Sequence, residues 1–151
     1  MRRRSLAAII AALAVAACGL PTIDKAADAQ AKALYEQIRT GADLSQNPDL
    51  GPDLRKPAAL AQLTAIKAML PPGVPTSVVN PAWDLKAGTG GVSATLVHAY
   101  RYPDVTVLAQ TVLAKTKSDV WQIVGFRVTL QSSGRHAPAG AVTNDKSNQT
   151  T

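Results

Sequence analysis

The sequence predicts an α+β domain in which two helices pack on a curved, four-stranded antiparallel meander. Two stretches before Pro71 carry apolar residues at helical spacing, which favours amphipathic helices. From Thr76 onward, runs rich in Val, Thr and aromatic residues are separated by turn-forming residues, which favours consecutive strands. The 151 residues of the chain suffice for one such domain of ordinary size.

The amino end predicts an export signal ahead of this domain. Residues 2–4 are arginines, and residues 6–17 form an unbroken run of alanine and branched aliphatic side chains. A positive head followed by a short apolar run is typical of a secretory signal peptide. Because the run is too short to span a bilayer, we expect residues 1–17 to be cleaved.

The apolar run ends in residues 15–19, Val-Ala-Ala-Cys-Gly, which resemble the lipobox of bacterial lipoproteins. The resemblance implies cleavage before Cys18 and attachment of acyl chains such as palmitate to it, with residues 18–22 as lipidated cysteine and tether. It also implies a protein held by lipid in the bacterial cell envelope. Gly19 is similar to lipoproteins sent to the outer membrane, facing the periplasm. The alternative is an ordinary secretory signal with an incidental cysteine.

The charge and the cysteine and histidine content argue against a nucleic-acid partner, a disulfide framework and a metal site. Removal of residues 1–17 discards three arginines and no acid, which leaves 13 basic and 10 acidic residues. No basic stripe with interleaved aromatics remains, so we expect no nucleic-acid partner. One cysteine and two histidines cannot complete a disulfide framework or a four-ligand metal site, so we expect no metal and no cofactor.

The first helix is predicted to begin at Ile23, behind an N-capping Thr22, and to end at Gly41. Residues 42–56 are rich in Pro, Gly, Asn and Asp and are expected to form a loop. Pro57 suits the first turn of a second helix, which Pro71-Pro72-Gly73 ends. The apolar stripes are Ile23, Ala27, Ala31, Leu34 and Ile38 in the first helix, and Leu60, Leu63, Ile66 and Leu70 in the second.

Four strands are predicted over residues 76–85, 91–102, 105–117 and 120–131. Pro81 cannot donate a backbone hydrogen bond, so the first strand is expected at the sheet edge or with a bulge. Turns at Pro103-Asp104 and Ser118-Asp119 would set both hairpin registers. The expected pairs are Leu96–Thr111, His98–Ala109 and Tyr100–Val107 in one hairpin, and Leu113–Val124, Thr111–Phe126 and Ala109–Val128 in the next.

The opposite face of the predicted sheet mixes polar and aliphatic side chains. It would carry Val97, Val112, Trp121 and Ile123, which suggests an interface with another envelope protein or a second copy of the chain. An ordinary solvated face with scattered aliphatics remains the alternative.

Two helices followed by a long antiparallel meander resemble the NTF2-like, or cystatin-like, α+β fold. Residues 119–128, Asp-Val-Trp-Gln-Ile-Val-Gly-Phe-Arg-Val, are similar to the last strand of small secreted members. The resemblance covers residues 23–131 and implies a cone-shaped domain with a space between sheet and helices. That fold hosts enzymes, binders and dimerisation modules, so it does not select a function. Residues 132–151 lack large apolar side chains and are expected to form a disordered tail.

In NTF2-like enzymes the space between sheet and helices is the active pocket. The resemblance therefore implies that Tyr35, His98, Tyr100 and Thr111 line it. The alternative is a core histidine satisfied by a tyrosine hydroxyl or a backbone carbonyl. No carboxylate is expected beside His98, so no acid–base pair and no catalytic residue is evident.

Trp83 and Trp121 could stack on a ligand or close the core against the helices. Two functions thus stay open. One is a membrane-anchored envelope lipoprotein with a non-catalytic binding or protein-interaction domain. The other is a small-ligand carrier or enzyme whose pocket is lined by His98 and Tyr100.

Overall fold

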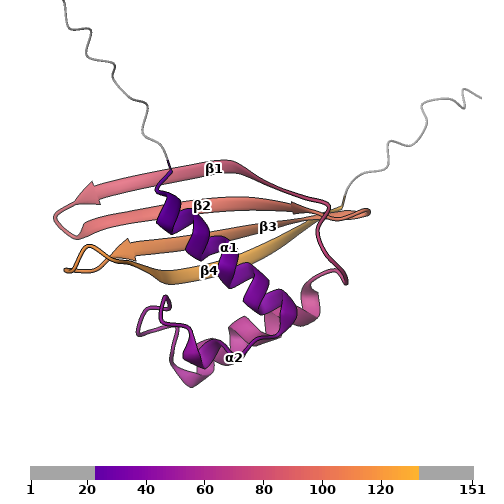
Figure 1. The fold of residues 1–151 in the computed structure, drawn as a ribbon, viewed down its shortest axis with the longest axis horizontal. Helices are drawn as coiled ribbons and strands as arrows, with labels where there is room; N and C mark the ends of the chain where they lie inside the picture. The colour runs from indigo at the N-terminus through magenta and orange to yellow at the C-terminus, as the bar shows by residue number, and fades with distance from the viewer. Residues whose placement is uncertain (1–22, 133–151) are drawn as a thin grey trace, which may run out of the picture.

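The structure is a computed structural model and describes residues 23–132. It contains an open antiparallel sheet in the order β1-β2-β3-β4, with one long helix lying across a face of the sheet (Figure 1). The predicted α+β class, with two helices ahead of a four-stranded antiparallel meander, is confirmed. The signal peptide, Cys18, the tether and most of the predicted tail lie outside the described residues. The elements are α1 (Lys25–Thr40), η1 (Leu44–Gln46), α2 (Pro57–Ile66), η2 (Lys67–Met69), β1 (Ser77–Gly88), β2 (Gly91–Arg101), β3 (Val105–Lys115) and β4 (Trp121–Ser132).

Helix α1 is capped at both ends by side-chain and backbone groups. Its N-cap is Asp24, whose carboxylate accepts hydrogen bonds from the backbone N–H groups of Ala26 (2.8 Å) and Ala27 (3.4 Å). The predicted start at Ile23 is therefore wrong by two residues, because a carboxylate also complements the positive end of the helix dipole. Gly41 ends the helix at φ 77°, as predicted.

The apolar stripe of α1 forms the centre of the core. The two tight alanines allow the helix to lie close to the sheet, and larger side chains follow toward its carboxyl end. Helix α2 begins at Pro57, as predicted, and contributes one fully buried side chain, Leu63. The buried residues of α1 are Ala27, Ala31, Leu34, Tyr35 and Ile38.

The first predicted hairpin register is confirmed at all three pairs, Leu96–Thr111, His98–Ala109 and Tyr100–Val107. Strand β1 is an edge strand whose register shifts between Val79 and Ala82. This irregularity lies at Pro81, which cannot donate to the neighbouring strand.

The second hairpin register is correct away from the turn and wrong near it. Thr111 pairs with Phe126 as predicted, but Leu113 pairs with Ile123 instead of Val124. The turn places Asp119 at φ 60°, and a bulge follows in β4. The extra residue reverses which side chains face the helices, so Ile123 is buried whereas Val124 is 45% exposed.

The free edge of β4 is partly covered by the loop that precedes α2. Ile123 donates its backbone N–H to the Asp49 carbonyl, and its own carbonyl accepts from Gly51, both at 2.8 Å. Leu50 forms an isolated parallel bridge with Ile123 and is fully buried. The loop thus protects the edge beside the bulge from further strand pairing.

Candidate ligand-binding site

Tyr35, His98, Tyr100 and Thr111, predicted to line a pocket, lie together between α1 and the sheet. Each of the four is at most 2% exposed, so they form a packed polar core and not the wall of an open cavity. The structure brings three of them together, with the His98 and Tyr100 ring centroids 6.2 Å apart and Tyr35 stacked on Tyr100. Packed aromatic rings from helix and sheet occupy the space where a pocket was expected.

The aromatic part of this core is a stack. The rings of Tyr35, on α1, and Tyr100, on β2, lie 3.5 Å apart at an interplanar angle of 11°. The Tyr35 hydroxyl hydrogen-bonds the Tyr102 hydroxyl at 2.9 Å. Burial raises the pKa of both Tyr35 and Tyr100 far above the usual value, so neither hydroxyl ionises near neutral pH.

A carboxylate lies beside His98, contrary to the prediction that none would. His98 Nε2 donates to Asp28 Oδ1 at 2.8 Å, and Lys32 binds the other carboxylate oxygen at 2.8 Å. Partial burial alone would raise the pKa of Asp28, but hydrogen bonds and charge attraction from Lys32 and His98 lower it. The His98 ring is therefore held by a carboxylate. The sequence had suggested a histidine that lines a pocket or one that bonds a tyrosine hydroxyl or a backbone carbonyl.

The sequence did contain a signal for this contact. Asp28 stands three residues before Ala31 and seven before Tyr35, so it lies on the same helix face as the buried stripe. A carboxylate at such a position normally needs a partner from the facing sheet. Asn80 lies within the bulge of β1, and its side-chain nitrogen is 3.5 Å from His98 Nε2. It is thus a second polar neighbour of His98, next to Asp28.

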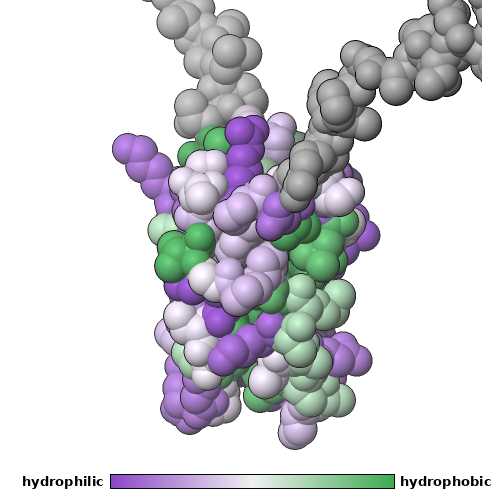
Figure 2. Space-filling model, turned by 90° about the vertical axis from the view of Figure 1, so that its right-hand side faces the viewer, coloured by the Kyte–Doolittle hydropathy of each residue, from purple (hydrophilic) through white to green (hydrophobic). Residues whose placement is uncertain are grey.

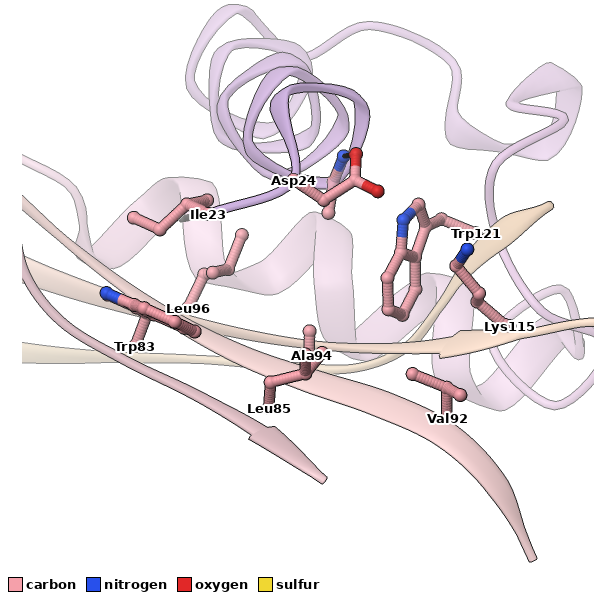
Figure 3. A pocket seen from close by; sticks show the side chains of 10 residues that line it. Ile23, Asp24, Trp83, Leu85, Val92, Ala94, Leu96, Lys115 and Trp121 are labelled. Carbon is pink, nitrogen blue, oxygen red and sulfur yellow. Dashed lines mark hydrogen bonds between the residues drawn. The ribbon is translucent and has the colours of Figure 1, made fainter. Parts of the chain in front are cut away.

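A separate pocket opens beneath the amino end of α1, and we call it the tryptophan pocket (Figure 3). Its volume is about 340 Å³. Figure 3 shows Trp83 and Trp121 on opposite sides of Ala94, with Asp24 above them. Most of the wall is aliphatic. The lining residues are Ile23, Asp24, Ala27, Trp83, Leu85, Val92, Ala94, Leu96, Lys115 and Trp121.

The pocket arises because the sheet extends beyond its helical cover. Strands β1 and β2 run on to the turn at Gly88–Gly91, while α1 starts only at Lys25. The floor residue Ala94, opposite Leu85, is too small to fill the space between the two tryptophans. Trp121 is 5% exposed and Trp83 is partly buried. Each ring therefore packs on the hydrophobic core and also forms part of the pocket wall.

Charged groups lie at the rim of the tryptophan pocket. The pKa of Asp24 is lowered, mainly by the indole N–H of Trp121 and then by the backbone N–H of Ala26. That indole N–H faces the carboxylate without the geometry of a full hydrogen bond, and it has no other partner among the described residues. The Lys115 ammonium lies 5.2 Å from the Trp121 ring centroid and binds Asp119 at 2.7 Å.

Of the four predicted interface residues, two lie in the core. Trp121 and Ile123 are 5% and 0% exposed because the bulge in β4 turns them toward α1 and the loop. The expectation that they face outward is therefore wrong. Val97 and Val112 do lie on the outer face, partly buried, on neighbouring strands.

The far end of the sheet, where β1 begins and β4 ends, offers no broad apolar field in the view of Figure 2. Hydrophobic and hydrophilic residues are interspersed there. Val78 and Leu130 are 41% and 44% exposed at this end. Val79 and Val74, close to Val78 in the sequence, are 42% and 71% exposed as well, and exposed apolar side chains are common on protein surfaces.

Comparison with family models, with curated proteins and with solved structures yields no match to this chain.

Within residues 23–132, no helix combines the length and apolar character of a membrane span. Nor does that part of the chain hold three His, Cys, Asp or Glu side chains grouped so that they could hold a metal ion.

Proposed function

We propose that this protein is a lipoprotein of the bacterial cell envelope whose domain is a non-catalytic binding module. The acyl chains on Cys18 would hold it to the membrane, with the domain in the periplasm and the outer membrane as the destination. The binding site would be the tryptophan pocket.

One observation carries the anchor: the single cysteine of the chain falls where the signal-like apolar run stops, inside a lipobox-like sequence. The folded domain supports it, because α1 begins at Lys25 and leaves only a short connection to Cys18. Two or three acyl chains suffice for stable attachment, since each buried methylene contributes about 0.8 kcal/mol.

The non-catalytic role is supported by where the reactive groups lie. His98 is 1% exposed and Tyr35 and Tyr100 are equally inaccessible, so a solute could reach none of them without unfolding the core. The carrier or enzyme with a pocket at His98 and Tyr100 is therefore the weaker proposal. The tryptophan pocket has aromatic and mostly aliphatic walls, and the Lys115 ammonium at its rim is already paired with Asp119, which suits binding better than catalysis.

We further propose that the domain is a small NTF2-like, or cystatin-like, cone. The order of two helices and a meander supports this, as does the placement of α1 across one sheet face. An experimental structure in which the four strands wrap around α1 would support the assignment, and a flat sheet would contradict it.

Protein interaction through the outer sheet face remains part of the proposal, now on Val97 and Val112 alone. The hollow beside Val112, formed where Gly125 has no side chain, favours this part of the face. Val112→Asp should then convert a dimer to a monomer in light scattering after size exclusion. A wild-type chain that is already monomeric would contradict a homodimer.

Membrane fractionation tests the anchor. Wild-type protein should float with outer-membrane vesicles in a density gradient and resist extraction by high salt. The Cys18→Ser protein should not undergo lipoprotein processing and should fail to reach that fraction. Recovery of processed wild-type protein in the soluble periplasm would contradict the proposal.

A further inference from the structure

We propose that the tryptophan pocket binds one acyl chain of a membrane phospholipid at the surface to which the domain is anchored. The proposal specifies the ligand of the proposed binding module, and it rests on the proposed anchor for the source of that ligand. The pocket chemistry can be tested without the anchor.

The pocket lies close in sequence to the proposed lipid anchor. Ile23 lines the pocket and follows Cys18 by five residues, which span at most about 18 Å when fully extended. An acylated Cys18 lies at the membrane surface, so the pocket is restricted to the region next to the lipid headgroups. On a long linker, the pocket could instead lie far from the membrane.

The size of the pocket and the chemistry of its wall favour an acyl chain. At about 340 Å³, the cavity lies at the small end of the range of ligand pockets, about 300–1,000 Å³. It can take a single chain and not a whole lipid. Leu85, Val92 and Leu96 offer contacts without hydrogen bonding, while the two tryptophans combine a broad apolar ring with one polar N–H.

The charged residues at the rim of the pocket favour an esterified chain over a free fatty acid. Lys115 is the one cation among the lining residues, and Asp119 already binds it, while Asp24 places a second carboxylate nearby. The lining residues therefore offer a free fatty-acid carboxylate no unpaired cation, and the Asp24 carboxylate repels it. An esterified chain with a neutral or zwitterionic headgroup needs no such cation.

The chain offers its own reporter, because its only two tryptophans both line this pocket. The first experiment uses the mature chain, residues 18–151, with Cys18→Ser, which keeps every residue that the structure describes. Lysophosphatidylcholine with a dibrominated acyl chain is added below its micelle concentration. We expect saturable quenching of tryptophan fluorescence at one lipid per chain, and weaker binding of the brominated free fatty acid.

Two matched substitutions separate the pocket from general lipid adsorption. Ala94→Leu fills the floor of the pocket and should weaken binding by about tenfold or more. Ala114→Leu makes the same change on the opposite face of the sheet, one strand away, and should leave binding intact. Circular dichroism confirms that both variants fold, and Trp83→Phe provides a second pocket variant should Ala94→Leu unfold. Unsaturable quenching, or equal quenching in the two leucine variants, would overturn the proposal.

The second experiment identifies the source of the chain. The lipidated full-length product is placed in phosphatidylcholine vesicles brominated on one acyl chain. Quenching that Ala94→Leu abolishes supports a membrane phospholipid. If the unlipidated chain binds but the lipidated one is not quenched, the anchor's own acyl chain fills the pocket and the phospholipid source is overturned. If Cys18 carries no lipid yet the first experiment succeeds, the anchor fails and the pocket stands.

Discussion

Asp28 should stabilise the fold mainly through His98. His98 is 1% exposed and its Nε2–H has the Asp28 carboxylate as its acceptor, at 2.8 Å. A hydrogen bond to a charged group contributes about 1.5–3 kcal/mol, and leaving a buried donor unpaired costs a similar amount. The Lys32 side chain is 48% exposed, so its pair with Asp28 adds only about 0.3–0.5 kcal/mol.

These values predict that Asp28→Ala lowers the free energy of unfolding by about 2–3 kcal/mol, while Lys32→Ala lowers it by less than about 0.5 kcal/mol. Asp28→Asn keeps an acceptor oxygen without the charge and should lie between them. Urea unfolding of the Cys18→Ser chain, followed by tryptophan fluorescence at pH 7, measures all three. An Asp28→Ala protein as stable as wild type, or a Lys32→Ala protein equally destabilised, would refute the reasoning.

The same pair predicts a pH dependence. The pKa of Asp28 is lower in the folded protein than its usual 3.8, so the folded state favours the ionised carboxylate. Its contribution is fully present above the unfolded value and is lost as the pH falls toward the folded one. The stability gap between wild type and Asp28→Asn should therefore shrink below about pH 4. A gap that widens there would contradict the assigned direction.

Four further substitutions test the second hairpin, the loop beside it and the helix end by thermal or urea unfolding. Ile123→Ala should cost about 2–5 kcal/mol and Val124→Ala less than about 0.5 kcal/mol, whereas the register without a bulge predicts the reverse. Gly51→Ala should destabilise by about 1 kcal/mol or more, because its Cβ would lie 3.1 Å from the Ile123 carbonyl oxygen; an unchanged midpoint would show that this loop does not hold the β4 edge. Gly41→Ala should cost about 1 kcal/mol or more from its φ of 77°, and a neutral result would exclude the left-handed cap.

The first hairpin could be predicted because only one alternation fits it. Between residues 92 and 100 the even positions carry the larger apolar side chains, apart from Val97, and a single register places them opposite Val107, Ala109 and Thr111. Helix α1 was predictable for the same reason, because its apolar residues fit one stripe. Its exact start depended on which polar side chain caps it, and Asp24 competes with Thr22.

Strand β4 could not be predicted by alternation because both of its parities are apolar near the turn. Trp121 and Ile123 fit one face, and Val124 and Phe126 fit the other. The bulge allows Trp121 and Ile123 to be buried together with part of Phe126, while Val124 is exposed. Gly125 within the strand was the available signal, since an isolated glycine in a strand often marks a bulge.

The candidate site shows a similar division. The NTF2-like resemblance implied the grouping of Tyr35, His98 and Tyr100, and strand alternation places the last two on one face, but neither tells how completely side chains fill a space. The tryptophan pocket depends on where α1 begins relative to the end of the β1–β2 hairpin, and that offset is a tertiary feature. Both tryptophans line the tryptophan pocket, and Trp121 is buried against the core instead of lying on the outer face as predicted.

The intact mass of the protein purified from the membrane fraction shows whether Cys18 is the lipidated first residue. We expect a chain that starts at Cys18 and is heavier than its sequence by the diacylglyceryl group and, where the amine is acylated, by a third chain. The Cys18→Ser protein should retain residues 1–17 and its unmodified mass. A wild-type chain cleaved elsewhere, or one whose mass matches the bare sequence, would contradict the account.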